Sequence, residues 1–179
     1  MEKKLREQAI QDSLTGLFNR RYLRQSIKND LARCKRYNSQ FSLMMIDINR
    51  FKEINDRYSH QTGDKLLQEV AGLLKKTVRN SDTVIRYGGD EFLIVLLETG
   101  GNTDQVKKRI RKNIQKWNQK QNLFDFPLTL AIGSSHWEPQ TGKDLEEMLK
   151  EADLNMYKNK QRFRKKQRKK RGPKFQGID

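Results

Sequence analysis

The sequence predicts an α+β fold, an α/β sandwich in which helices flank a central, mainly antiparallel sheet. Two observations support this fold class. Apolar runs of strand length alternate with segments of helical period, in the order β-α-α-β-β-α-β after a first helix. Two of the strands are consecutive and are joined by Gly88-Gly89-Asp90, a strong β-hairpin signal. At 179 residues, such a core fits one compact domain with short extensions.

The first half of the chain opens with a charged segment, residues 1–11, that indicates a short helix at the end of a linker. Residues 12–16 (Asp-Ser-Leu-Thr-Gly) are typical of a turn. The expected elements that follow are a helix over 20–37, a buried strand over 41–46 that ends on Asp47, a short helical turn over 51–58, and a longer helix that Gly63-Asp64 opens.

In the second half, the pattern predicts a pair of strands followed by alternating helix and strand. The expected elements are strands over 83–87 and 92–97, a basic helix over about 104–119, a strand over 128–132 after Pro127, and a last helix over 144 to about 160.

The net charge of +16 is concentrated near one end of the chain. Between Lys158 and Lys174 there are eleven basic residues and no acidic one, whereas the rest of the chain has 27 basic and 22 acidic residues. Such runs stay solvated and bind polyanions weakly, and this one lacks the interleaved aromatic residues of a base-stacking surface. We therefore expect a domain over residues 12–164, a solvated basic tail over 165–179, and no nucleic-acid partner.

The cysteine and hydropathy patterns indicate the compartment. The single cysteine, Cys34, excludes an internal disulfide framework and suits a reducing cytoplasm. No apolar run approaches the roughly 20 residues of a membrane span. We expect a cytoplasmic domain, and this expectation is compatible with a membrane-anchored parent protein.

Three carboxylates are expected to meet at one edge of the sheet. Asp47 ends a buried strand, and Asp90 and Glu91 lie in the turn that joins two others. Like charges at close range repel, so such a cluster favours a cation, and Mg²⁺ prefers oxygen ligands that it shares with substrate phosphates. The arrangement suits phosphoryl transfer. Taken singly, each acid also fits a solvated strand end or an ordinary turn.

Polar side chains follow the buried strand. They are Asn49, Lys52, Asn55, Asp56, His60 and Asp64. Asn and Asp side chains can hydrogen-bond the edge of a guanine base, and a lysine such as Lys52 can meet a phosphate. The plainer interpretation makes His60 a helix-entry hydrogen-bonder and Gly63-Asp64 a turn with an acidic charge at a helix N-terminus.

Five motifs agree in order and spacing over most of the chain. They are Asp12-Ser-Leu-Thr-Gly-Leu-Phe-Asn-Arg-Arg21, Ile46-Asp-Ile-Asn-Arg-Phe-Lys-Glu-Ile-Asn-Asp56, His60 with Gly63-Asp64, Arg86-Tyr-Gly-Gly-Asp-Glu-Phe92, and Ala152-Asp153 with Tyr157 and Lys160. From about Gln11 to Arg164, the chain resembles the GGDEF family of diguanylate cyclases. The resemblance implies a nucleotidyl-cyclase, palm-like core and the condensation of two GTP molecules into cyclic di-GMP and two pyrophosphates.

The resemblance also implies the metal and catalytic positions. Asp47, Asp90 and the carbonyl of Ile48 match ligands of Mg²⁺, with Mn²⁺ as the alternative ion. Glu91 matches the acid that binds metal and accepts the proton of the attacking 3′-hydroxyl.

The same resemblance assigns guanine recognition to Asn55 and Asp64, with His60 nearby. A carboxylate at Asp64 can accept from both N1-H and N2-H₂ of guanine, which adenine cannot match. Gly88 and Gly89 leave room for the nucleotide to approach the hairpin, because a side chain there would block it.

The resemblance assigns phosphate contacts to Lys52, Lys160 and Arg164. Each subunit presents one GTP and two domains meet antiparallel, so the resemblance implies a homodimer, which we expect to be transient. An upstream sensory domain is expected in the parent protein.

Arg79 and Asp82 match the product-inhibition motif Arg-x-x-Asp, which ends six positions before Gly88. Cyclic di-GMP would then be both product and inhibitor. The alternative is an exposed salt bridge at a helix end, which contributes little.

The chain departs from the family pattern at six positions. They are Asn49, Ser59, Ala131, Asn155, Asn159 and Phe163. None removes an expected metal ligand, so we expect an active enzyme. Two alternatives stay open: a catalytically silent GGDEF domain that binds cyclic di-GMP through Arg79 and Asp82, and a nucleic-acid-binding protein that acts through its basic tail.

Overall fold

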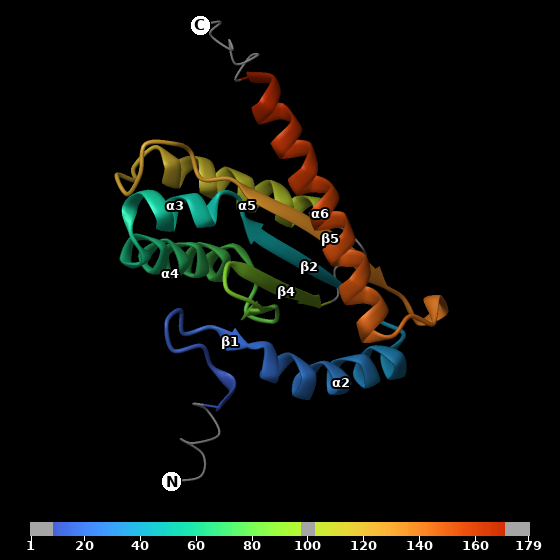
Figure 1. Ribbon diagram of the computed structural model, residues 1–179. Helices are drawn as coiled ribbons and strands as arrows, with labels where there is room; N and C mark the ends of the chain where they lie inside the picture. The colour runs from blue at the N-terminus through green and yellow to red at the C-terminus, as the bar shows by residue number, and fades with distance from the viewer. Residues whose placement is uncertain (1–8, 98–102, 171–179) are drawn as a thin grey trace, which may run out of the picture.

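The computed structural model of the protein describes residues 9–97 and 103–170. Its elements, shown in Figure 1, are β1 (Phe18–Asn19), α2 (Arg20–Tyr37), β2 (Phe41–Ile48), α3 (Phe51–Tyr58), α4 (His60–Thr77), β3 (Thr83–Arg86), β4 (Glu91–Leu97), α5 (Thr103–Asn118), β5 (Leu130–Trp137), a short 3-10 helix (Pro139–Thr141) and α6 (Leu145–Lys170). The order from β2 to β5 is β-α-α-β-β-α-β, which confirms the expected core.

The strands form one five-stranded sheet in the order β1-β3-β4-β2-β5. β1 runs parallel to β3, and the other pairs are antiparallel. The long apolar run is confirmed as a strand flanked by β4 and β5, and all eight residues of β2 are buried. The mainly antiparallel sheet is therefore confirmed as well.

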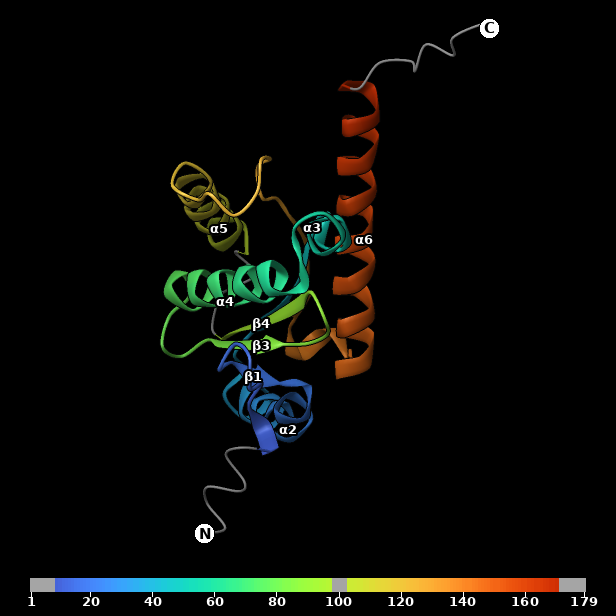
Figure 2. The same ribbon diagram turned by 60° about the vertical axis from the view of Figure 1, so that its left-hand side comes forward.

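Helices cover both faces of this sheet (Figure 2). Side chains alternate along a strand, so neighbouring residues of β2 enter opposite layers. Met44 and Ile46 belong to the apolar cluster under α3, α4 and α5. Leu43 and Met45 belong to the cluster under α2 and α6. By the same alternation, Asp47 lies on the face of α2 and α6.

The bounds of α4 and β5 differ from those expected. α4 begins at His60 rather than at Gly63-Asp64, because Ser59 caps it: the Ser59 hydroxyl accepts from the Thr62 N–H at 3.2 Å. β5 covers Leu130–Trp137 rather than 128–132. Its polar second half, Gly133-Ser134-Ser135-His136, carries little apolar signal, but pairing with β2 over the whole strand extends it.

α6 continues to Lys170, well past the expected end near Lys160. It runs without a break through the expected domain boundary after Arg164, because Lys, Arg and Gln are good helix formers. Residues 1–8 of the expected linker helix and 171–179 of the expected tail lie outside the described residues. Within the described ranges, no helix has both the length and the apolar character to cross a membrane.

Candidate active site

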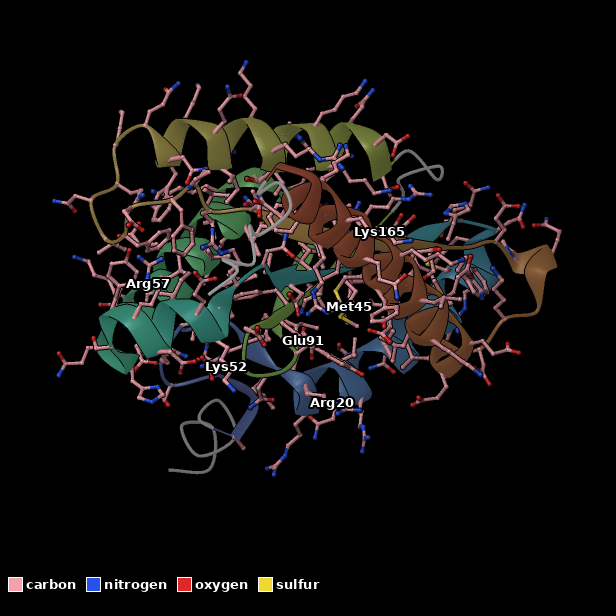
Figure 3. The ribbon with its side chains drawn as sticks, turned by 45° about the horizontal axis from the view of Figure 1, so that its top comes forward. Arg20, Met45, Lys52, Arg57, Glu91 and Lys165 are labelled. Atoms are coloured by element: carbon pink, nitrogen blue, oxygen red, sulfur yellow. The ribbon has the colours of Figure 1, made fainter. Side chains whose placement is uncertain are left out.

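The expected acidic cluster lies where the end of β2 meets the β3–β4 turn. Asp47 stands directly opposite Glu91 in the antiparallel register, and the Ile48 N–H donates to the Asp90 carbonyl at 3.3 Å. The Gly88 N–H donates to the Glu91 carbonyl at 3.2 Å and closes the turn (Figure 3 labels Glu91). The fold thus brings the three predicted carboxylates to one edge of the sheet.

Asp47 is almost fully buried, with 4% of its surface exposed. One carboxylate oxygen, Oδ2, accepts from the Lys160 ammonium at 2.6 Å. The other, Oδ1, is buried and has no hydrogen-bond partner among the described residues. Burial raises the pKa of Asp47; Lys160 acts in the opposite direction, and the charge of Asp90 adds to the rise. The Lys160 ammonium therefore compensates only part of the cost of burying the Asp47 carboxylate.

Glu91, on the neighbouring strand β4, is subject to the same two effects, burial and nearby negative charge. Burial raises the pKa of Glu91, and the charges of Asp47 and Asp90 raise it further. Gly88 gives this side chain its room, because a Cβ at position 88 would lie 2.6 Å from the Glu91 Oε2 atom. A raised pKa suits a group that accepts a proton during a reaction near neutral pH.

The donor set fits a divalent cation. Across residues 9–97 and 103–170, no three His, Cys, Asp or Glu side chains form a ready-made metal cage. A hard cation would nonetheless suit these acids. It would neutralise the repulsion between Asp47 and Glu91, which lie opposite each other, and would give the unpartnered Asp47 oxygen a partner. Mg²⁺ is commonly held by only one or two protein carboxylates together with substrate phosphates.

The predicted guanine-reading side chains lie on α3 and at the start of α4. The Asn55 Oδ1 atom is buried and unpartnered among the described residues, whereas His60 and Asp64 are exposed. Gly63 makes this arrangement possible, because a Cβ there would lie 1.9 Å from Asn55 Oδ1. The sequence places Gly63 in a turn and in a motif with His60 and Asp64, and the packing of α3 against α4 adds its contact with Asn55.

Arg86 is a second residue whose role sequence reasoning missed. Its guanidinium donates to both carboxylate oxygens of Asp12 at 3.1 Å and to the Gly89 carbonyl at 2.9 Å. The N-terminal turn and the β3–β4 turn are thereby tied together. Both residues belong to the quoted motifs, but 74 positions separate them in the chain.

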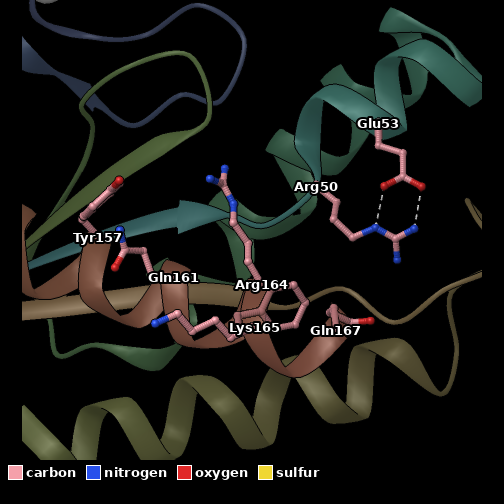
Figure 4. Close-up of a pocket in the computed structure, with 8 residues that line it drawn as sticks. Arg50, Glu53, Tyr157, Gln161, Arg164, Lys165 and Gln167 are labelled. Carbon is pink, nitrogen blue, oxygen red and sulfur yellow. Dashed lines mark hydrogen bonds and ion pairs between the residues drawn. The ribbon is translucent and has the colours of Figure 1, made fainter. Parts of the chain in front are cut away.

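Basic side chains of α6 complete the site. A cavity of about 590 Å³ lies between α3 and α6 (Figure 4). Its lining residues are Arg50, Glu53, Tyr157, Gln161, Phe163, Arg164, Lys165 and Gln167. Arg50 is held by two hydrogen bonds to Glu53, at 2.7 and 2.5 Å, and stacks on Phe126. Arg164 also lines the cavity, and its charge lowers the pKa of Asp47. Lys52 is exposed on α3 and does not line this cavity.

The predicted inhibitory residues lie at the other end of the hairpin. Asp82 accepts from the Arg79 N–H at 2.9 Å and from the Leu97 N–H at 3.2 Å, so its carboxylate organises the turn before β3. Leu97 ends β4 and Glu91 begins it, which separates the two regions by about 20 Å at 3.3 Å per residue. Arg79 and Asp82 both line a cavity of about 240 Å³ beside β1.

Comparison with known proteins decides the family. Residues 9–166 match the family model described as diguanylate cyclase, GGDEF domain. The chain belongs to the GGDEF family. Diguanylate cyclases of this family generally require a divalent metal.

Relatives of the GGDEF chain include named diguanylate cyclases. Over 165 residues it is 39% identical to diguanylate cyclase DosC of Escherichia coli K12, an alignment that covers 91% of the chain and 35% of DosC. The chain thus spans about a third of the length of that relative. Diguanylate cyclase SiaD of Pseudomonas aeruginosa, solved with its activator SiaC, has a TM-score of 0.79 at 28% identity, over 90% of this chain and 62% of SiaD.

A third comparison concerns the fold alone. The coiled coil and GGDEF domain of DgcB from Caulobacter crescentus, solved in complex with c-di-GMP, has a TM-score of 0.80 at 23% identity. The alignment covers 89% of this chain and 85% of the DgcB chain. The GGDEF fold therefore extends over nearly all of the described residues.

Proposed function

We propose that this GGDEF domain condenses two GTP molecules into cyclic di-GMP and releases two pyrophosphates. The observation that carries the proposal is the buried Asp47 carboxylate, which has one unpartnered oxygen, stands opposite Glu91 and contacts Lys160. A plain strand end needs none of these features. Named diguanylate cyclases among the relatives support the same reaction.

Asp47, Asp90, Glu91 and the carbonyl of Ile48 would hold the metal. When bound, Mg²⁺, or Mn²⁺ in its place, supplies positive charge to the acids and to the α-phosphate. Glu91 accepts the proton of the attacking 3′-hydroxyl, a role that its raised pKa favours.

The nucleotide is recognised at both ends. Asn55 and Asp64 read the guanine edge, with His60 at the entrance of α4. At the other end, Lys160 and Arg164 of α6 attract the phosphates, and both lie close enough to Asp47 to act on its pKa. Lys52 contributes a phosphate contact from α3, and Gly88 and Gly89 admit the nucleotide to the hairpin.

Two domains are needed for one turnover. Each subunit presents one GTP, and each 3′-hydroxyl attacks the α-phosphate of the other nucleotide. A single subunit therefore cannot close the cyclic product. We propose a transient homodimer in the cytoplasm, which an upstream sensory domain of a longer parent protein would stabilise.

The test is identification of the product. The protein is incubated at high concentration with GTP and Mg²⁺, and the products are separated by chromatography; the expected result is cyclic di-GMP with pyrophosphate. Glu91→Gln keeps the shape of the side chain and removes its basicity, so it should abolish turnover. GTP left unchanged by the wild-type protein would instead support the silent receptor.

Arg79 and Asp82 are proposed to bind the product and inhibit the enzyme. The 240 Å³ cavity that both residues line, away from the acids, supports this role. If the protein is a silent receptor, the same residues would bind cyclic di-GMP without catalysis. Calorimetric titration with cyclic di-GMP, in the wild type and in Arg79→Ala, measures the binding in either case.

A further inference from the structure

α6 is attached to the free edge of the sheet by two asparagine side chains. Within the described part of the chain β5 is an edge strand, because β2 is its one pairing partner there. The Asn159 Oδ1 atom accepts from the Ile132 N–H at 3.3 Å, and the Asn155 Nδ2 group donates to the Ser134 carbonyl at 2.9 Å. A backbone N–H can only donate and a carbonyl can only accept, so these partners fix the orientation of both amides.

Gly133 lies between the two bonded strand residues and allows α6 to approach the strand at backbone distance. A Cβ at position 133 would lie 2.0 Å from the Met156 nitrogen and 2.3 Å from the Ala152 carbonyl oxygen. Figure 1 shows α6 running beside β5. The helix therefore has a defined position along the strand, set by one close contact and two directed hydrogen bonds.

That position determines where the basic side chains of α6 lie. Lys160 follows Asn159 directly, and its ammonium lies 2.6 Å from the carboxylate of Asp47, on the strand that pairs with β5. A shift of α6 by one residue would move it by about 1.5 Å and turn it by roughly 100°. Either change would take Lys160 away from Asp47.

We propose that Asn155 and Asn159 are positioning residues, which hold α6 in the register that presents Lys160 to Asp47 and Arg164 to the cavity beside α3. The inference rests on the proposed function, because it assumes that these cations bind the phosphates of GTP.

The polarity of the two hydrogen bonds provides a matched pair of variants. Asn159→Asp keeps an acceptor for the Ile132 N–H, whereas Asn155→Asp loses the donor to the Ser134 carbonyl and sets two oxygens against each other. Both substitutions add the same charge one helical turn apart. The alanine variants, which add no charge, separate the loss of a hydrogen bond from the added charge. Asn155→Ala and Asn159→Ala remove each bond outright.

Asn118→Ala is the control for a general loss of stability. The Asn118 side chain makes the same kind of bonds to backbone, donating to the Leu128 carbonyl at 2.9 Å and accepting from the Leu128 N–H at 2.8 Å. It lies at the end of α5, outside the proposed machinery. Its loss should destabilise the protein without changing how GTP binds.

Two readouts test the proposal. Hydrogen exchange of the Ile132 amide should accelerate in Asn159→Ala and stay near the wild-type rate in Asn159→Asp. The KM for GTP should rise roughly five-fold in either alanine variant, with kcat nearly unchanged, as expected when one hydrogen bond that supports uniform binding is lost. Asn155→Asp should raise KM more than Asn159→Asp.

Several outcomes would overturn the proposal. Unchanged Ile132 exchange in Asn159→Ala would show that the bond does not hold the edge. An equal rise of KM in Asn118→Ala would assign the effect to stability alone. If the wild-type protein makes no cyclic di-GMP, the proposed function fails separately; exchange and the calorimetric Kd for GTP then replace KM, and equal Kd values in wild type and both alanine variants would still refute the positioning role.

Discussion

Gly63→Ala separates the substrate-binding role of this glycine from its structural one. A Cβ at position 63 would lie 1.9 Å from the Asn55 Oδ1 atom and 3.0 Å from its Cγ, so the Asn55 side chain must leave its position. The backbone is an ordinary part of α4 and accepts alanine. The substitution therefore acts on the guanine-reading amide.

The two energies involved in folding nearly cancel. Alanine in place of glycine stabilises a helix by about 0.5–1 kcal/mol. Moving Asn55 from its rotamer costs about 0.5–1.5 kcal/mol. The free energy of unfolding should thus stay within about 1 kcal/mol of wild type. Catalysis has no such compensation, because loss of a hydrogen bond to guanine costs about 1–3 kcal/mol, or roughly 5- to 150-fold in kcat/KM.

The assay measures pyrophosphate release against GTP concentration, together with the midpoint of thermal unfolding. Gly72→Ala is the matched control: it lies in the same helix, and nothing within 4 Å would meet its Cβ. This control should gain stability and keep its activity. Gly63→Ala with kcat/KM within about two-fold of wild type would refute the reasoning, as would additive effects of Gly63→Ala and Asn55→Ala, because both should remove the same contact.

Three further outcomes are expected. Lys160→Met should lower kcat/KM for GTP by at least ten-fold, since about 1.4 kcal/mol of charge-assisted bonding accounts for that factor; steady-state kinetics checks it. Asp12→Asn should lower the free energy of unfolding by about 1 kcal/mol at pH 7. Burial raises the pKa of Asp12, but the hydrogen bonds from Thr15 and Arg86 lower it by more, so the folded pKa lies below the unfolded value of 3.8. The stabilising contribution of Asp12 is therefore present above pH 3.8 and is lost as pH falls through the folded pKa. Denaturant titrations at pH 7 and pH 3 measure this loss. Arg79→Ala should weaken cyclic di-GMP binding by calorimetry and leave the initial rate unchanged.

The order of the core elements could be predicted because each leaves a local signal. The run Phe41–Ile46 is apolar except for Ser42, as expected of a strand covered on both sides, and Gly88-Gly89-Asp90 marks the hairpin. The second half of β5 left no such signal. Residues 133–136 are small or polar, and their strand conformation follows from pairing with β2, a contact across many intervening residues.

The part of the site that lies where a strand ends and a hairpin turns could be predicted from the order of the strands. Asp47 opposite Glu91 follows from one strand end and one turn. The contact of Lys160 with Asp47 joins residues 113 positions apart, and only the resemblance suggested that they share a site. Gly63 and Asn159 act through the packing of a helix on its neighbour, which no local pattern encodes.

The position of Asp47 also bears on how β2 selects its register. Apolar side chains of β2 fill the layers on both faces, so a slip by one residue would still bury apolar surface. Asp47 removes that freedom, because a slip would turn its carboxylate toward the layer of α3, α4 and α5, away from Lys160, and an unpaired buried charge is costly. The acid proposed to hold the metal therefore also penalises the wrong register, and the same ion pair with Lys160 serves the fold before any nucleotide binds.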